Sequence, residues 1–156
     1  MPSVEVRPVR AEDIGRIVEI EKASFKDAYP RSLLENLMTL SPEGFLVAVW
    51  EGRIIGYVSS IVERRHTARL VSVAVHPHYR RRGVAWRLMA ELVKTLKNKD
   101  VDEVLLEVRE SNKAAIRLYK SLGFQPRKIL QKYYEDGENA LVMSLRLKPP
   151  SATENL

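Results

Sequence analysis

Residues 71–85 read VSVAVHPHYRRRGVA, and three kinds of local sequence meet in this short stretch. Its valine-rich beginning is typical of a buried strand, and its middle, with Pro77 and several basic residues, is typical of a loop. Gly83 then opens a segment whose apolar residues recur at helical spacing. These residues are Val84, Leu88, Met89, Leu92, Val93 and Leu96. The stretch therefore predicts a strand, a basic loop and a long amphipathic helix in that order.

This arrangement predicts a binding site for an anion such as phosphate. The first N–H groups of a helix are free to bind an anion, and small residues such as Gly83 and Ala85 let the backbone come close to it. Three consecutive arginines, Arg80, Arg81 and Arg82, add positive charge. The stretch is neither a Walker loop nor a dinucleotide-binding fingerprint. The alternative is a solvated basic turn whose glycine only relieves packing, and the stretch alone leaves both interpretations open.

Strand and helix patterns continue on both sides of this stretch. We expect strands at residues 4–7, 45–50, 54–62, 70–75, 104–108, 125–133 and 140–147, and helices at residues 11–24, 32–40, 83–97 and 112–122. Elements in this order predict an α/β fold, with a mixed central β-sheet of about seven strands and helices on both faces. We expect one domain over residues 1–147 and a loosely ordered tail over residues 148–156.

The amino-acid composition excludes several classes of function. The chain has 156 residues, of which 45% are hydrophobic and 29% charged, as in a globular protein. It contains no cysteine, which excludes disulfides, thiolate metal sites and a cysteine nucleophile. No apolar run approaches the roughly 20 residues of a membrane span, and residues 1–10 lack the apolar core of a signal peptide, so we expect a cytoplasmic protein. The net charge of +6 favours an anionic partner without identifying it.

Three blocks of sequence resemble a known family. Residues 80–85, RRRGVA, are similar to the Arg/Gln-x-x-Gly-x-Gly/Ala motif of the GNAT superfamily of N-acetyltransferases. Residues 106–119, LEVRESNKAAIRLY, and residues 133–140, YYEDGENA, resemble the corresponding strings of the RimI- and Ard-type protein N-terminal acetyltransferases. The resemblance extends over roughly residues 4–147, with the three blocks in the family's order.

The resemblance implies an enzyme that uses acetyl-CoA as co-substrate and needs no metal. It implies that protein or peptide N-termini are the substrates, ribosomal proteins among them, and that neither a membrane nor nucleic acid is a partner. The implied acetyl-CoA-binding residues are Val73, Ala74, Val75, Arg80, Arg81, Arg82, Gly83, Val84, Ala85, Trp86, Asn112, Tyr119 and Lys120. The implied substrate-binding residues are Asp27, Tyr29, Glu107 and Tyr134.

Glu107 is the sharpest catalytic candidate. In the expected strand 104–108, Val104, Leu106 and Val108 face one way and Glu107 faces the other. A carboxylate removed from water binds its proton more tightly, which suits a general base, and the resemblance puts the family's proposed base at this position. The alternative is an ion pair with a nearby arginine. Some Ard-type enzymes also carry a histidine where this chain has Arg69, so Glu107 is expected to act without one.

The expected helix 112–122 places Asn112, Ile116 and Tyr119 on one face. The resemblance implies that Asn112 contacts the cofactor, and that Tyr119 lies near its sulfur and is the acid for the departing thiolate. Two structural alternatives remain open. Asn112 is also a suitable N-terminal helix cap, and Tyr119 could be a packing residue with a solvated hydroxyl.

We therefore expect direct attack of a protein amine on acetyl-CoA, without a covalent enzyme intermediate. A peptide α-amine has a pKa of about 7.7–8.0 and a lysine side chain one of about 10.4. A single carboxylate suits the α-amine, which is easier to deprotonate. The alternatives are a GNAT enzyme that acts on lysine side chains or on a small amine, and a basic nucleic-acid-binding module whose affinity falls with salt.

Overall fold

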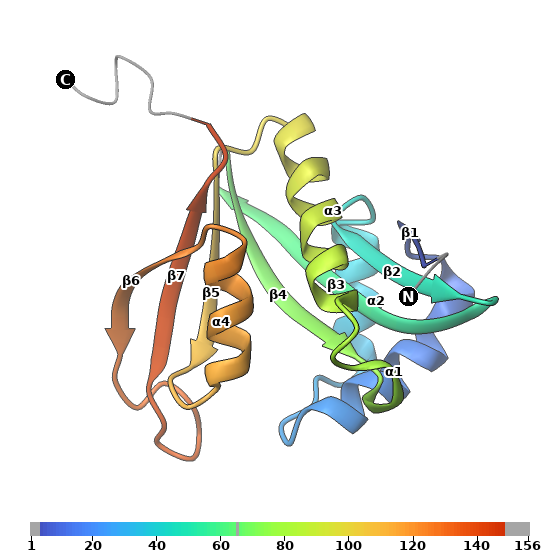
Figure 1. Cartoon of the computed structure of the whole chain (residues 1–156), viewed down its shortest axis with the longest axis horizontal. Coiled ribbons are helices and arrows are strands. Elements are labelled where there is room, and N and C mark those ends of the chain that lie inside the picture. The colour runs from blue at the N-terminus through green and yellow to red at the C-terminus, as the bar shows by residue number, and fades with distance from the viewer. Residues whose placement is uncertain (1–3, 65, 149–156) are drawn as a thin grey trace. The chain divides into compact units, whose positions relative to one another are not determined.

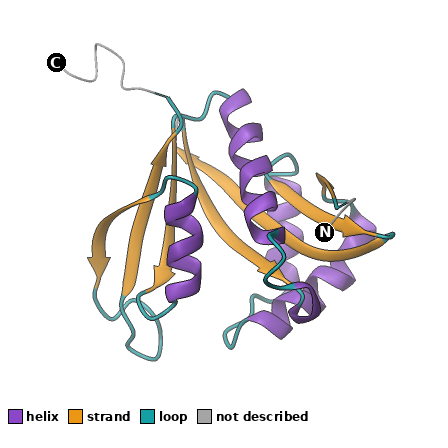
Figure 2. Cartoon of the chain, viewed as in Figure 1, coloured by secondary structure: helices purple, strands orange, loops and turns teal. Residues whose placement is uncertain are grey.

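The computed structural model describes residues 4–64 and 66–148 (Figures 1 and 2). Its strands and α-helices are, in chain order, β1 (Glu5–Pro8), α1 (Ile14–Ser24), α2 (Arg31–Leu40), β2 (Phe45–Trp50), β3 (Arg53–Arg64), β4 (Thr67–Val75), α3 (Val84–Asn98), β5 (Glu103–Arg109), α4 (Lys113–Ser121), β6 (Gln125–Leu130) and β7 (Ala140–Arg146). Short 3-10 helices, η1 (Ala11–Asp13) and η2 (Pro77–Tyr79), precede α1 and follow β4. The order of strands and helices is the one that the sequence predicts.

The strands form a seven-stranded sheet in the order β1-β2-β3-β4-β5-β7-β6. Strand β4 pairs with β5 in parallel, whereas β5 and β7, like β6 and β7, are antiparallel. The sheet is therefore mixed, and the predicted fold class is confirmed.

Three predicted boundaries differ by three residues: α1 begins at Ile14 instead of Ala11, β4 begins at Thr67 instead of Leu70, and β6 ends at Leu130 instead of Tyr133. Lys132 has a left-handed backbone with φ of +52°, so the chain turns out of the strand there. The predicted tail over residues 148–156 lies outside the described residues except for Lys148. No helix in the described ranges is both long enough and apolar enough to cross a membrane.

The described residues group into two compact units, residues 4–61 with 70–95, and residues 62–64 and 66–69 with 96–148. In the first unit, α1 and α2 cover one face of the sheet. Their core side chains, with those of the strands, are Ile14, Ile17, Ile20, Leu34, Leu37, Phe45, Val47, Tyr57 and Ala74. Each large aliphatic or phenylalanine side chain among them contributes about 1.5–3 kcal/mol when it is fully buried.

Helix α3 covers the opposite face of this unit. Val47 and Tyr57 are cross-strand partners that face α1 and α2, so the next pair, Ala48 and Gly56, faces the other way. A Cβ atom at Gly56 would lie 3.2 Å from Cδ1 of Leu88 on α3 and 3.0 Å from the backbone oxygen of Ala74. Only glycine fits this close approach, and the expectation of helices on both faces holds in this unit.

In the second unit, β5 alternates between buried and half-buried residues as the sequence predicts. Val104, Leu106 and Val108 are buried, and Glu107 is half-buried opposite Val142 of β7. Helix α4 buries Ile116 and Tyr119. It ends at Ser121, and Gly123 after it has a φ of +100°, as expected of a glycine that follows a helix.

Candidate active site

The loop between β4 and α3 has a backbone shaped for an anion. It leaves β4 at His76, whose N–H donates to Ile55 O at 2.8 Å, and passes through η2. Arg81 and Gly83 then have positive φ angles of 62° and 79°. Left-handed residues within a turn can direct successive N–H groups into one concave surface that binds anions. The loop therefore supports the anion-binding interpretation by its backbone as well as by its charge.

The three arginines of this loop have different surroundings. Arg80 is held by the protein, because its Nε donates to Val75 O at 2.9 Å and a terminal nitrogen donates to Ser24 Oγ at 3.1 Å. Arg81 and Arg82 are exposed, and Arg82 lies 6.0 Å from the centre of the Tyr79 ring. We infer that Arg80 fixes the loop to β4 and α1, whereas Arg81 and Arg82 leave their charge available to a ligand.

The start of α3 completes this loop. The carbonyl of Gly83 accepts the N–H of Arg87 at 3.0 Å, so the N–H groups before Arg87 stay outside the helical hydrogen-bond pattern. Val84 is buried and anchors the first turn, while the neighbouring Trp86 is 48% exposed. Exposed N–H groups and unpaired guanidinium groups are the donors that phosphate prefers. The residues present therefore fit the pyrophosphate of acetyl-CoA.

Glu107 forms an ion pair with Arg69, as the alternative interpretation of the sequence predicted. Its Oε1 accepts a hydrogen bond from Arg69, which also binds Glu63 at 2.5 Å. The Glu107 side chain is 17% exposed. Burial alone would lower the pKa of Arg69, but the hydrogen bonds to Glu63 and Glu107 outweigh it and raise that pKa. Glu107 therefore lies beside a permanent positive charge.

Both structural alternatives at α4 are also present in the geometry. The Oδ1 of Asn112 accepts the N–H of Ala115 at 3.1 Å, so Asn112 caps the helix. Tyr119 is buried, with its ring 5.8 Å from that of Phe124. Burial raises the pKa of Tyr119, with a smaller contribution from Tyr134, so the phenol is a donor at neutral pH. Lys120 is exposed on the following position.

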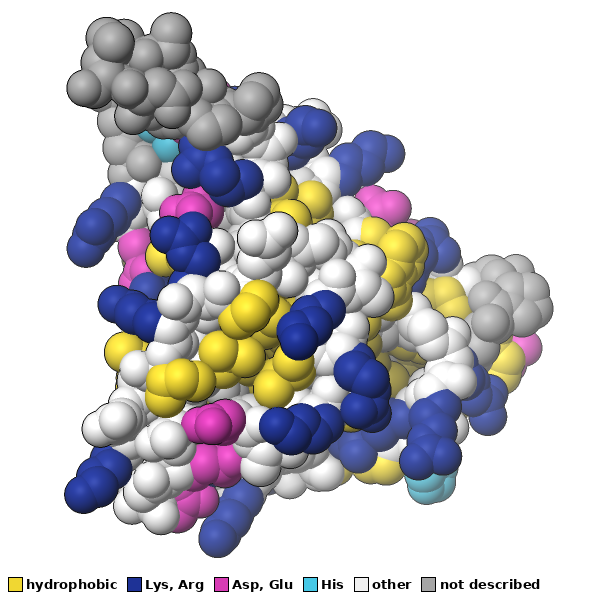
Figure 3. Space-filling model, turned by 60° about the vertical axis from the view of Figure 1, so that its left-hand side comes forward, with side chains coloured by type: hydrophobic (Ala, Val, Ile, Leu, Met, Phe, Trp, Pro, Cys, Tyr) yellow, Lys and Arg dark blue, Asp and Glu magenta, His cyan; other side chains and the backbone are white. Residues whose placement is uncertain are grey.

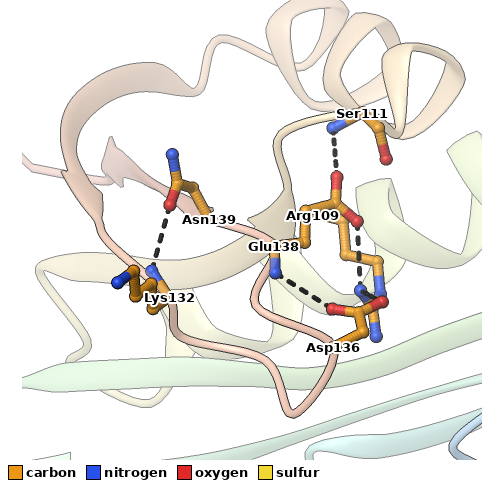
Figure 4. Close-up of polar contacts among 6 residues, drawn as sticks. All are labelled: Arg109, Ser111, Lys132, Asp136, Glu138 and Asn139. Carbon is orange, nitrogen blue, oxygen red and sulfur yellow. Dashed lines mark hydrogen bonds and ion pairs between the residues drawn. The ribbon is translucent and has the colours of Figure 1, made fainter.

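The loop between β6 and β7 is folded around Arg109, at the end of β5 (Figure 4). The guanidinium donates to Asp136 at 2.8 Å and to Glu138 at 3.0 Å, and it lies 4.1 Å from the centre of the Tyr134 ring. Glu138 in turn accepts the N–H of Ser111 at 2.8 Å. Hydrogen bonds from Ser111 and Arg109 lower the pKa of Glu138. These contacts hold Tyr134 in a defined position.

The loop between α1 and α2 carries the other predicted substrate residues. Asp27 and Tyr29 are exposed, the latter by 37%. The backbone N–H of Tyr29 donates to Oε2 of Glu21 at 2.8 Å. The carboxylate of Glu21 is buried and also accepts from the hydroxyl of Tyr57.

Sequence reasoning missed Glu21. A usable signal was present, because Glu21 follows Ile14 by seven residues and Ile17 by four, which puts it on the apolar face of α1. A carboxylate at a core-facing helical position indicates a buried polar network, whose partners the sequence does not name.

One histidine lies close to two carboxylates. His66, Asp100 and Asp102 bring potential metal-ligand atoms within 4.8 Å of one another. The ammonium group of Lys148 binds Asp100 at 2.5 Å and lies 3.6 Å from Asp102. A cation of the protein itself, the ammonium group of Lys148, therefore already pairs with both carboxylates of this group.

Comparisons with known proteins agree with these features. The sequence profile of the Acetyltransferase (GNAT) family matches residues 14–124. The chain is 33% identical over 157 residues to an N-alpha-acetyltransferase of Sulfurisphaera tokodaii, an alignment that covers 91% of this chain and 92% of the relative. Its structure is similar to that of Ard1 from Thermoplasma volcanium, with a TM-score of 0.90, 31% identity and coverage of 94% and 99%. It is also similar to a ribosomal-protein-S18-alanine N-acetyltransferase from Escherichia coli, with a TM-score of 0.84, 27% identity and coverage of 96% and 97%.

We predict that Gly83→Val weakens CoA binding by about tenfold or more, because a β-branched residue at this φ costs roughly 1–3 kcal/mol and the loop must rearrange. A Cβ at Gly83 meets no atom within 4 Å, so the strain lies in the backbone alone. Isothermal calorimetry with CoA measures the effect. Gly52→Val is the matched control, because Gly52 also has open space and a positive φ, in the β2–β3 turn. Unchanged affinity in a folded Gly83→Val protein would refute the site.

Proposed function

Because the chain belongs to the GNAT family of acetyltransferases, we propose that it transfers the acetyl group of acetyl-CoA to the N-terminal α-amine of proteins. The observation that carries this proposal is the similarity, over nearly the whole chain, to an N-alpha-acetyltransferase and to Ard1. A nucleic-acid-binding module, which the net charge alone allowed, has no support in these comparisons.

Acetyl-CoA, when bound, supplies a thioester that an amine can attack. We assign its pyrophosphate to the backbone N–H groups from Arg81 to Ala85 and to the side chains of Arg81 and Arg82. The backbone of Val73 to Val75, at the end of β4, is assigned to the pantetheine arm. Arg80 contributes by holding the loop in shape. The fit of these residues to an anion, on both backbone and charge, supports the assignment.

We assign the general base to Glu107. The pair with Arg69 uses Oε1 of the carboxylate, and no other residue in the described ranges bonds Oε2. One oxygen therefore orients the group while the other can accept a proton from the amine, directly or through one water. A single carboxylate suits the α-amine, because that amine loses its proton more easily than a lysine side chain does.

We assign to Tyr119 the role of the acid at the departing sulfur. A thiol has a pKa of about 8.5, below that of any ordinary phenol, and burial raises the pKa of Tyr119 further. Complete proton transfer from Tyr119 is therefore uphill. The hydroxyl acts as a hydrogen-bond donor that stabilises the negative charge developing on sulfur.

Asp27, Tyr29 and Tyr134 are assigned to the peptide. Tyrosine hydroxyls can bond the first peptide groups of an extended N-terminus. One similar structure is that of an enzyme named for the alanine of a ribosomal protein, so we propose ribosomal proteins in the cytoplasm among the substrates.

Peptides that carry both a free α-amine and a lysine test the substrate class. At neutral pH the lysine reaction needs about 3.5 kcal/mol more for deprotonation, since roughly 2.5 pKa units separate the two amines. We expect mass spectrometry to find acetyl on the N-terminus, and a peptide with a blocked N-terminus to be inert. Dominant lysine acetylation, or a preference for a small amine offered in parallel, would show that the wrong amine was chosen.

We predict that Glu107→Gln lowers kcat at pH 7 by about 10²–10⁴-fold, the usual effect of a lost general base. The α-amine becomes neutral as the pH rises through about 8, so the loss should shrink above that pH. Steady-state rates between about pH 6.5 and 9.5, a range that brackets this pKa, measure both effects. Glu63→Gln is the matched control, since it also removes a carboxylate from Arg69. A Glu107→Gln protein with the wild-type rate at pH 7, or an equal loss in the control, would contradict the assignment.

Tyr119→Phe is predicted to lower kcat by more than it raises the KM for either substrate, because the donor is needed only when sulfur becomes charged. The ring that packs on Phe124 is retained. Tyr134→Phe removes a hydroxyl from a predicted peptide contact instead and should raise the peptide KM. If Tyr119→Phe kept kcat within about twofold, far less than the usual general-acid effect, Tyr119 would be a packing residue.

A further inference from the structure

The carboxylate of Glu21 is buried without a cationic partner. Glu21 is only 1% exposed, and it lies on α1 among the core residues Ile17 and Ile20. No ion pair to Glu21 is present in the described residues. Removing a carboxylate from water is costly, and a position on the apolar face of a helix would ordinarily hold a residue such as leucine. The charge at this position therefore needs an explanation beyond stability.

The two oxygens of Glu21 have different partners. Oε1 faces the sheet, where it accepts from the Tyr57 hydroxyl on β3 and, at 3.2 Å, from the Ser72 hydroxyl on β4. Burial, with the nearby charge of Glu21, raises the pKa of Tyr57, so this hydroxyl keeps its proton and donates. Oε2 faces the loop, where it accepts the Tyr29 N–H at 2.8 Å.

Glu21 consequently holds both ends of the segment from Phe25 to Tyr29. Its backbone oxygen accepts the N–H of Phe25 at 3.0 Å, and its side chain accepts the N–H of Tyr29. The segment between them has no helix or strand and exposes the side chains of Asp27 and Tyr29. The buried carboxylate holds this loop in place. If the Tyr29 N–H moved away, Oε2 would lose its hydrogen-bond donor, and a buried carboxylate oxygen without a donor is costly.

We propose that Glu21 is a positioning residue that fixes the loop of residues 25–30, and with it the ring of Tyr29, for binding the substrate peptide. This proposal rests on the proposed function, in which Tyr29 contacts the peptide. Glu21 does not touch the reacting atoms. It lowers the ordering cost of peptide binding, because the loop is already in place before the peptide arrives.

The surroundings of Glu21 allow the anchor to be removed selectively. The hydroxyls of Tyr57 and Ser72 lie 2.9 Å apart, so they can bond each other when the carboxylate is gone. In Glu21→Met, an unbranched apolar side chain of similar length, the Tyr29 N–H loses its acceptor, and so does one of the two hydroxyl protons, because the bond between the hydroxyls uses only the other. Replacing a buried charge by an apolar residue is often neutral or stabilising, so we expect this variant to fold.

Glu21→Gln should preserve the anchor. Its side-chain carbonyl can accept the Tyr29 N–H, while its amide group donates to the two hydroxyls, which can turn to accept. Glu19→Met is the matched control, because it removes an exposed carboxylate from the same helix. Glu21→Leu serves as a second apolar variant if Glu21→Met does not fold.

Hydrogen exchange at the Tyr29 amide and steady-state kinetics together test the proposal. In Glu21→Met we expect the Tyr29 amide to exchange at least about tenfold faster, and the peptide KM to rise about tenfold with an unchanged KM for acetyl-CoA, as for one lost hydrogen bond to a charged group. Glu21→Gln and Glu19→Met should stay within about twofold of the wild type, which is less than the effect of one hydrogen bond.

Three outcomes would overturn the proposal: unchanged exchange in folded Glu21→Met, faster exchange with an unchanged peptide KM, or a Glu21→Gln protein as impaired as the apolar variants. Failure of the proposed function is recognised separately. A wild-type protein that acetylates no peptide α-amine disproves the function and the peptide part of the proposal. Exchange measured without substrate still decides whether Glu21 anchors the loop.

Discussion

The buried carboxylate of Glu21 is the constraint around which the first unit is organised. A charge at this depth requires donors on every accessible side, so α1 must bring it against hydroxyls of β3 and β4 and a backbone N–H of the following loop. This fixes the C-terminal end of α1 on the sheet. The same helix end presents Ser24 to Arg80, so the loop of residues 25–30 starts from this helix end and the loop of residues 76–83 is bound to it.

The secondary structure could be predicted wherever the local spacing of apolar residues reflects which side of a helix or strand is packed against the core. The strand predicted at residues 45–50 is β2 without a change of boundary, and the helix boundaries shift by only one to three residues. The prediction was wrong at the end of β6, because residues 125–133 continue a pattern compatible with a strand. The chain leaves the sheet there because Lys132 adopts a positive φ and Arg109 binds the loop that follows. Neither cause is a local property of residues 125–133.

In the candidate site, too, local features could be predicted from the sequence, whereas contacts between distant residues could not. The loop of residues 76–83 could be recognised as a candidate anion site because its donors are consecutive residues, and their charge and glycine content stand together in the sequence. The environment of Glu107 could not, because Arg69 lies 38 positions earlier in the chain. The alternation of side chains along the strand indicated on which side of the sheet Glu107 lies. It did not decide between a general base and an ion pair. The contact between Glu21 and Ser72, 51 positions apart, could not be predicted for the same reason.

The pairing of charges also explains how a net charge of +6 serves an anion site. Key carboxylates are paired with arginines: Glu107 shares Arg69 with Glu63, and Asp136 and Glu138 share Arg109. Arg81 and Arg82 have no carboxylate partner among residues 4–64 and 66–148. On the face shown in Figure 3, basic side chains are spread widely, whereas acidic ones gather in a few groups. Salt screens the interaction between exposed charges over distance. The contribution of a basic side chain to ligand binding therefore depends on how closely the ligand can approach it. In the loop of residues 76–83, the left-handed backbone at Arg81 and Gly83 can direct N–H groups toward an anion that the exposed arginines beside it can attract.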